Sequence, residues 1–335
     1  MKWTKITLNT TTEALDYLGA IAMDLGLEGF EIEDNVPLTE EDKKRMFIDI
    51  LPTLPPDDGS AKVSFYVPKD TDTEKLLEDI KREAADYESF CDFGAMTFDV
   101  ATTDDSDYIN NWKKYFKSFR VNDRLVIKPT WEEKAPMAKD GDTVIEIDPG
   151  TAFGTGAHET TKLCLLAMSE RLKKGDTCID IGCGSGILSI AAILFGARNA
   201  FGFDVDDNAS KISVENAGVN KIPAEYRESF DKCDIDAIKD GEILFATGNL
   251  LESEDLPKSL EGHTFDFTAA NILADVIIPL APYARKLTRT GGFITCSGIL
   301  TTKEDSVVKA LVENGFEIVG IERMGEWSGI TAKAV

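Results

Sequence analysis

Three glycines follow an acidic residue in the segment Asp180-Ile-Gly-Cys-Gly-Ser-Gly186, between a predicted strand and a predicted helix. Gly182 and Gly184 allow a tight turn and a close approach of the backbone to a ligand, next to the free N–H groups of a helix start. A dinucleotide fingerprint would need glycine where the chain has Ile187. Because Asp180 also suits a cationic ligand, the pattern favours an S-adenosylmethionine site over that fingerprint. A purely structural turn is the alternative.

Asp204 ends the next predicted strand along the chain. At that position in an open sheet, a carboxylate can accept both ribose hydroxyls of an adenosine, each charge-assisted hydrogen bond contributing about 1.5–3 kcal/mol. The alternative role is the N-cap of the following helix, which Asp206 or Asp207 could fill equally well. We therefore predict that Asp204 binds ribose.

A second glycine-rich loop, Asp148-Pro-Gly-Thr-Ala-Phe-Gly-Thr-Gly-Ala-His-Glu-Thr-Thr161, leads into a helix. A plain turn would need fewer glycines, without the interleaved aromatic, histidine and threonine residues. We expect Gly154 to approach the cofactor and Phe153 to form a wall beside it. His158 could serve as a general base, but we favour an ordered loop residue that hydrogen-bonds the backbone of its glycine turn.

Strands alternate with helices from about residue 122, a pattern typical of a parallel sheet covered on both faces. The predicted strands are 177–181, 200–205, 265–270 and 292–297, and the predicted helices are 186–194, 208–217, 274–286 and 303–313. The last two strands, 316–323 and 330–335, are too close in sequence for a crossover helix, so they must be antiparallel. One antiparallel C-terminal strand in a parallel sheet is typical of Rossmann-like methyltransferases. We interpret the charged, weakly periodic segment 222–248 as an insertion at the sheet edge.

The first part of the chain predicts a separate domain, 1–104, of ferredoxin-like α+β type with one additional strand. Its predicted strands are 2–8, 28–33, 45–51, 61–67 and 96–101, and its predicted helices are 12–25 and 73–87. Residues 105–121 begin with acidic and end with basic side chains, as a helix dipole prefers, and predict a linker helix. The remaining residues, 122–335, form the second predicted domain.

Composition restricts the partners of this chain. Its 335 residues include 36 Lys+Arg and 60 Asp+Glu, a net charge of −24 that repels phosphate backbones, so we expect a basic protein partner and no direct nucleic-acid contact. The basic and aromatic run 112–120 could bind RNA, although a solvated helix face is the favoured alternative. No signal peptide or membrane span is apparent, so we expect a cytoplasmic protein, and we expect a monomer. The six cysteines form no C-x-x-C pair, which indicates reduced thiols and no metal site.

The glycine loop that ends in Thr161 closely resembles the signature of the PrmA family, bacterial methyltransferases that act on large-subunit ribosomal protein eleven. The similar motifs in this sequence are P-G-x-A-F-G-T-G-x-H-x-T-T, WKKYFK at 112–117 with LVIKP at 125–129, DIGCGSGIL at 180–188 and NILA at 271–274. They cover roughly residues 105–300, whereas the N-terminal domain agrees in type more than in sequence.

The resemblance implies an S-adenosylmethionine-dependent protein N-methyltransferase that modifies lysine or α-amino groups. It implies cofactor contacts at Thr161, Gly182, Asp204 and Asn271, and it makes Asn271 the candidate catalytic residue. Since Asn271 is followed by Ile-Leu-Ala instead of Pro-Pro-Tyr, the aromatic shelf of N-P-P-Y methyltransferases is missing. A helix cap is the alternative role for this asparagine. A small-molecule methyltransferase is the alternative function, although it would not need a separate N-terminal domain to recognise its substrate.

Overall fold

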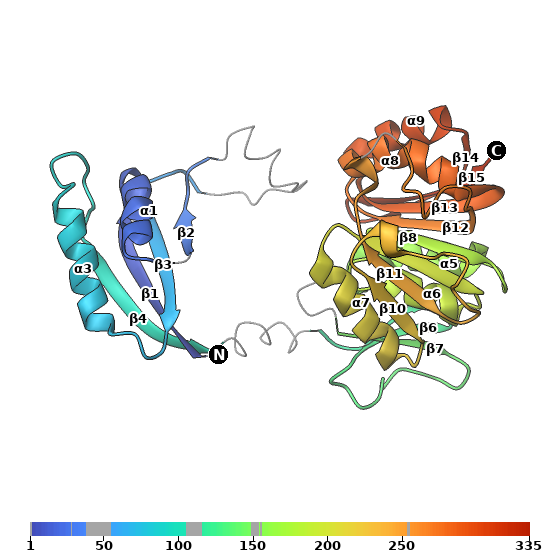
Figure 1. The fold of residues 1–335 in the computed structure, drawn as a ribbon, viewed down its shortest axis with the longest axis horizontal. Coiled ribbons are helices and arrows are strands. Elements are labelled where there is room, and N and C mark those ends of the chain that lie inside the picture. The colour runs from blue at the N-terminus through green and yellow to red at the C-terminus, as the bar shows by residue number, and fades with distance from the viewer. Residues whose placement is uncertain are drawn as a thin grey trace. The chain divides into compact units, whose positions relative to one another are not determined.

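A computed structural model describes residues 2–27, 29–37, 55–104, 116–148, 154, 156–252 and 255–335 (Figure 1). The chain divides into two compact units, Met1–Lys114 and Tyr115–Val335. The predicted strand 45–51, most of the predicted linker helix and Phe153 lie outside the described residues.

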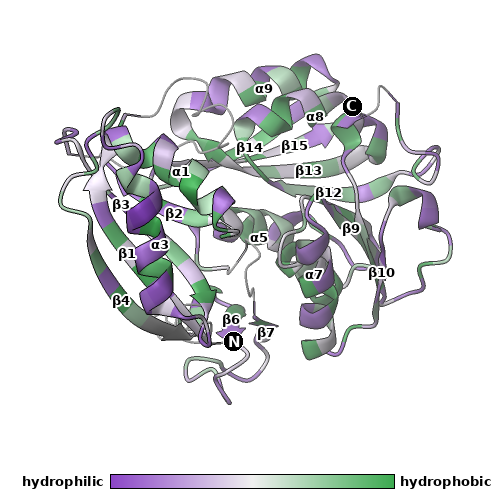
Figure 2. Ribbon diagram, turned by 60° about the vertical axis from the view of Figure 1, so that its left-hand side comes forward, coloured by the Kyte–Doolittle hydropathy of each residue, from purple (hydrophilic) through white to green (hydrophobic). Residues whose placement is uncertain are grey.

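The first unit is a four-stranded antiparallel sheet with two helices. The chain order is β1 (Lys2–Thr11), α1 (Leu15–Asp24), β2 (Phe30–Asp34), β3 (Ser60–Pro68), α3 (Thr73–Ala85) and β4 (Thr97–Asp104). The strands pair in the order β2-β3-β1-β4, which is the ferredoxin-like arrangement predicted from the sequence. In Figure 2 the ribbon of α3 carries both purple and green segments, as expected for a helix that buries one side. The core between sheet and helices includes Leu8, Leu18, Val63, Phe65 and Ile80.

The second unit contains an eight-stranded sheet in the order β10-β11-β9-β8-β12-β13-β15-β14. Its strands are β8 (Thr177–Ile181), β9 (Asn199–Asp204), β10 (Ala224–Arg227), β11 (Ile243–Thr247), β12 (Phe265–Asn271), β13 (Thr288–Leu300), β14 (Phe316–Met324) and β15 (Trp327–Ala334). The pairs from β10 to β13 are parallel, and β15 runs antiparallel to both of its neighbours. The sequence predicts this arrangement, a parallel sheet with one antiparallel strand near the C-terminus.

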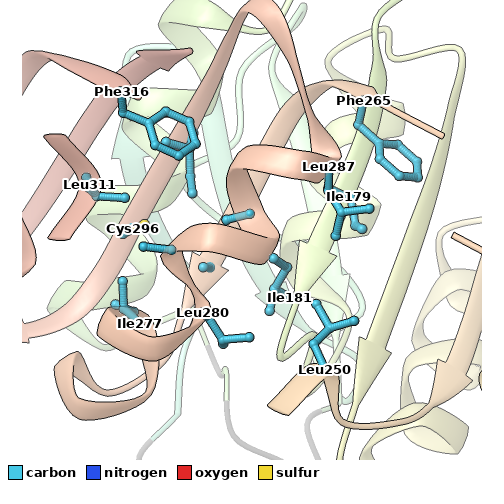
Figure 3. Packing of buried hydrophobic residues seen from close by; sticks show 14 of the residues in the cluster. Ile179, Ile181, Leu250, Phe265, Ile277, Leu280, Leu287, Cys296, Leu311 and Phe316 are labelled. Atoms are coloured by element: carbon cyan, nitrogen blue, oxygen red, sulfur yellow. The ribbon is translucent and has the colours of Figure 1, made fainter. Parts of the chain in front are cut away.

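Helices α5 (Glu159–Arg171), α6 (Ile187–Leu194) and α7 (Asp207–Val219) pack against one another and against the sheet, while α8 (Ala274–Leu287) and α9 (Glu304–Glu313) form a second helical layer. Figure 3 shows the core beside α8, where Ile277, Leu280 and Leu287 meet Ile179 and Cys296 of the sheet. Helices or loops cover both faces of the central strands. Strands buried in this way need apolar side chains on both faces, which explains their almost continuous apolar sequences.

Two expectations about the second unit are wrong. Segment 222–248 is not an insertion: it supplies edge strand β10 and interior strand β11, whose Ile-Leu-Phe-Ala run pairs with β9. The charged, exposed residues between these strands hide this short apolar run from a periodicity analysis. The end of the predicted linker helix is strand β5 (Phe119–Asn122), which joins β6 (Leu125–Pro129) and β7 (Thr143–Ile147) in a separate small sheet.

An aromatic cluster explains why the end of the predicted linker is not helical. Phe116 is buried against the rings of Phe119 and Trp131, at centroid distances of 6.3 and 5.8 Å. Arg120 pairs with Asp142 at 2.6 Å. These contacts belong to the second unit, so the described part of the basic run is structural.

Candidate functional site

The glycine turn between β8 and α6 is held by polar contacts from three directions. The Gly184 N–H donates to the Asp204 carboxylate at 2.9 Å, and its carbonyl accepts from the Ser213 hydroxyl at 2.9 Å. The Asn216 amide donates to the carbonyl of Ser185 at 2.9 Å. Gly182 has φ +74°, and a Cβ there would lie 2.4 Å from the side chain of Ile272. The turn is therefore a fixed cradle whose close approach requires a residue without a side chain.

Asp204 lies at the end of β9 and lines the adjacent cavity. One of its oxygens accepts from the Gly184 N–H, and the other accepts from the Asp206 N–H at 3.0 Å. Each carboxylate oxygen can accept a further hydrogen bond. Helix α7 is capped by Asp206, whose side chain accepts from the Asn208 N–H. The helix-cap role therefore belongs to Asp206, and the Asp204 carboxylate keeps acceptor capacity at the cavity.

Asp180 corrects the expectation of a direct ligand contact. It lies within β8, is fully buried, and accepts from the N–H and hydroxyl of Ser189 on α6 at 3.0 and 2.8 Å. Neighbouring strand residues face opposite sides of a sheet, and Ile181 is the one that lines the cavity. Burial, with a further contribution from the charge of Asp204, raises the pKa of the Asp180 carboxyl to about 7. Asp180 therefore ties β8 to the first turn of α6 and does not line the cavity.

Asn271 ends β12 at the same carboxyl edge of the sheet and lines the cavity. Its Nδ2 donates to the hydroxyl of Thr161 at 3.1 Å, and its buried Oδ1 has no hydrogen-bond donor among the described residues. Thr161 itself is fully buried on α5 and holds Asn271 without lining the cavity. An unsatisfied buried acceptor costs about 1–3 kcal/mol, which a donor on a bound ligand would recover. Asn271 does not cap α8, because the cap residue is Leu273.

The loop before α5 reaches the cavity through Gly154 and His158. Gly154 has φ +103° and its carbonyl accepts from the Ser185 hydroxyl at 2.6 Å, which joins the two glycine loops. His158 is the N-cap of α5 and accepts from the Thr160 N–H. The prediction that His158 is an ordered residue bonded to backbone is therefore confirmed, but the backbone partner is the start of α5, whereas the prediction placed it in the glycine turn.

These segments enclose a cavity of about 420 Å³. That volume is within the range of small-molecule sites, about 300–1,000 Å³. Its remaining described lining residues are mostly apolar: Thr160, Ile181, Cys183, Ile187, Leu188, Phe203, Val205, Gly248, Asn249, Leu250, Ile272, Leu273, Val276, Leu280, Gly298 and Trp327.

The lining residues that follow β11 and those on β13 and β15 are not predicted by the sequence motifs. Gly248 and Asn249 directly follow β11 at the carboxyl edge, so a correct assignment of that strand would have found them. Gly298 lies at an irregularity in the pairing of β13 with β15, and a glycine inside a strand is a recognised signal for a bulge. Nothing local in the sequence marks Trp327.

Cysteine thiols, possible metal ligands and apolar helices add no further site within the described residues. All six cysteines are free thiols, and burial raises the pKa of the Cys183 thiol well above its usual value, so this cavity residue is a poor nucleophile at neutral pH. Within the described ranges, no three His, Cys, Asp or Glu side chains gather as metal ligands would. The described helices include none that is long and apolar enough to span a membrane.

Comparison with known proteins places the chain in one family. The family model "Ribosomal protein L11 methyltransferase (PrmA)" matches residues 2–335. Proteins named ribosomal protein L11 methyltransferase from Lachnoclostridium phytofermentans and Lachnospira eligens are 46% and 44% identical to this chain, each over 99% of both chains. A crystal structure of ribosomal protein L11 methylase from Lactobacillus delbrueckii subsp. bulgaricus is 32% identical, with a TM-score of 0.53, and covers 65% of this chain and 99% of its own. By these matches, the chain belongs to the ribosomal protein L11 methyltransferase (PrmA) family.

Proposed function

We propose that this protein transfers methyl groups from S-adenosylmethionine to amino groups of ribosomal protein L11. The observation that carries the proposal is the buried Oδ1 of Asn271, which has no donor within the described residues and belongs to a side chain lining the cavity beside the glycine turn. The names of the relatives support the choice of substrate protein.

The residues around the cavity fit S-adenosylmethionine. The Asp204 carboxylate has acceptor capacity for ribose hydroxyls, and Gly182 provides the close backbone approach. Gly154 and Gly184 complete the two loops that border the cavity. When bound, the cofactor supplies a methyl group on a positively charged sulfonium, which is already activated for transfer. The protein therefore needs to align the amine and exclude water.

Asn271 would orient the incoming amine through its Oδ1, and Thr161 would keep the amide in place. The amine must be neutral to attack. Deprotonating a lysine with a pKa near 10.4 costs about 4.6 kcal/mol at pH 7, whereas an α-amine near 7.8 costs about 1 kcal/mol. Desolvation in this largely apolar cavity lowers the pKa of an amine, so the site needs no dedicated base. Both lysine and α-amino groups are proposed targets.

The decisive experiment incubates the protein with isotopically labelled S-adenosylmethionine and unmethylated L11, and locates the label by intact and fragment mass. Asn271→Ala tests the role of the amide. If Asn271 orients the amine, the rate at saturating cofactor falls more than cofactor affinity does; if it only holds the cofactor, both fall equally. Transfer of label to sites other than amines, or to no site, contradicts the proposal.

The N-terminal unit is proposed to recognise the substrate protein. It has its own sheet and core, while every described cavity residue belongs to the second unit. A truncated chain that begins at Tyr115 should bind S-adenosylmethionine but methylate L11 far more slowly, because remote binding energy no longer positions the amine. A folded truncation that works at the full-length rate would leave the unit a structural cap. We further propose that the enzyme is cytoplasmic and monomeric and that it makes no direct contact with nucleic acid. The alternative function is a methyltransferase that acts on a small molecule.

A further inference from the structure

The strand order divides the cavity into two ends. Asp204 on β9 and Gly248 after β11 lie at one end, and Gly298 on β13 and Trp327 on β15 lie at the other. Asn271 on β12 lies between them. Adjacent strands are about 4.8 Å apart, so β15 is about 10 Å beyond β12 on the side away from the proposed ribose site. We call the part of the cavity lined by Gly298, His158 and Trp327 the acceptor end. A cofactor whose ribose is held by Asp204 would not occupy this part, so the substrate can enter it.

Trp327 is held firmly at the acceptor end. It pairs with Leu300 at the start of β15, and its ring meets that of His158 edge-on at a centroid distance of 5.1 Å. The next residue, Ser328, is fully buried and donates to the Glu304 carboxylate at 2.6 Å. Glu304, on α9, also accepts two hydrogen bonds, at 2.8 and 2.6 Å, from Arg323, which pairs with Ser328 across the β14–β15 hairpin. These contacts fix the backbone that carries the indole, while Trp327 itself stays half-buried.

The charge of the substrate nitrogen gives the indole ring of Trp327 a possible ligand. On the proposed function, an amine gains a positive charge when it is methylated, and each added methyl replaces an N–H that Asn271 could bind. Among the described lining residues, the only carboxylate is Asp204, which lies at the opposite end. An aromatic face within about 6 Å of a cation attracts it without needing an N–H donor, and tryptophan is the strongest aromatic for this interaction.

We propose that Trp327 is the aromatic wall that contacts the substrate amine and stabilises the methylated ammonium. It supplies, from β15, the aromatic surface that the sequence lacks directly after Asn271. This inference rests on the proposed methyl transfer.

The test is a graded series at position 327. Trp327→Phe should lower kcat/KM for L11 by about threefold and Trp327→Leu by about tenfold, with the affinity for S-adenosylmethionine unchanged. Trp131→Phe is the matched control, because this tryptophan contacts Phe116 outside the cavity and its variant should keep the wild-type rate. Equal rates for wild type and Trp327→Leu, or equal losses in the Phe and Leu variants, would overturn the proposal.

A binding readout separates a cation contact from simple packing. In the complex with S-adenosylhomocysteine, choline should bind wild type at least about fivefold more tightly than its neutral isostere 3,3-dimethylbutan-1-ol, as measured by calorimetry, and Trp327→Leu should abolish that difference. Equal affinities of the two compounds for wild type would refute the cation contact. If wild type does not bind S-adenosylmethionine or methylate L11, the proposed function itself fails. Wild-type activity with an unchanged Trp327→Leu variant refutes only the role of Trp327.

Discussion

Gly298→Ala tests whether the backbone beside Asn271 sets the geometry of the site. Gly298 has φ +83°, and a Cβ there would lie 2.4 Å from the carbonyl oxygen of Ile272 and 2.8 Å from its carbonyl carbon. Both atoms are backbone, so no flexible side chain can move aside. The N–H of the same residue donates to the Ser297 carbonyl at 3.1 Å, which ties the Ile272 backbone to β13. An alanine must therefore displace the backbone of the residue that directly follows Asn271.

The expected loss of methylation rate follows from the steric overlap between the added Cβ and the Ile272 backbone. Ordinary contact begins near 3.4 Å, so the Ile272 peptide must move by about 1 Å, and a misplacement of that size can cost about 100-fold in rate. The left-handed backbone adds a stability cost of about 1–2 kcal/mol for alanine. We expect kcat for methylation of L11 to fall about 100-fold, with a smaller loss of affinity for S-adenosylmethionine, because Asp204 is two strands away from Asn271.

The assay combines initial methylation rates, calorimetric cofactor affinity and thermal unfolding. Gly320→Ala is the matched control: this glycine lies on β14, a Cβ added there would meet no described atom within 4 Å, and kcat should stay unchanged. A folded Gly298→Ala protein with kcat within about threefold of wild type would refute the reasoning, because the Ile272 peptide would then not control the reacting geometry.

Two further predictions concern aspartates. Asp204→Ala should weaken S-adenosylmethionine binding at least about tenfold in a folded protein, as measured by calorimetry. The control Asp206→Ala should lower the free energy of unfolding by about 1 kcal/mol, because α7 loses its cap, and should leave the cofactor affinity unchanged. Equal affinities in wild type and Asp204→Ala would contradict the assignment of Asp204 to the ribose. Asp180 has a raised pKa of about 7, so its protonated form favours the folded state, and this stabilisation is complete below the unfolded pKa near 3.8 and is lost as pH rises through 7. Asp180→Asn should therefore gain on the order of 2 kcal/mol relative to wild type between pH 5 and pH 8 in urea unfolding, and parallel pH profiles would contradict this.

The parts of the site that follow from local chemistry could be predicted from the sequence. A glycine turn after a strand and an acidic residue at the end of the next strand are short-range patterns, and the structure places Gly182, Gly184 and Asp204 together around one cavity. The strand order of the ferredoxin-like unit and the antiparallel β15 also follow from element order and loop length. These features depend on few residues that are close in the chain.

The remaining features depend on long-range packing. Asp180 belongs to the glycine motif, yet strand alternation turns it towards Ser189 and away from the cavity. Trp327 reaches the site because β15 inserts beside β13, a pairing that no local pattern reveals. Strand β11 is apolar but short, and the charged residues that flank it weaken the periodic pattern by which a strand is predicted. Sheet order and side-chain direction therefore decide which residues of a recognisable motif face the ligand.

Methyl transfer to L11 by wild type and by Asn271→Ala, measured at saturating S-adenosylmethionine, tests most directly whether the buried amide oxygen of Asn271 orients the accepting amine. We expect wild type to label amino groups of L11, identified by fragment mass, and we expect the variant to bind the cofactor but to transfer the label much more slowly. Labelling of L11 by Asn271→Ala at the wild-type rate would show that this oxygen does not orient the amine.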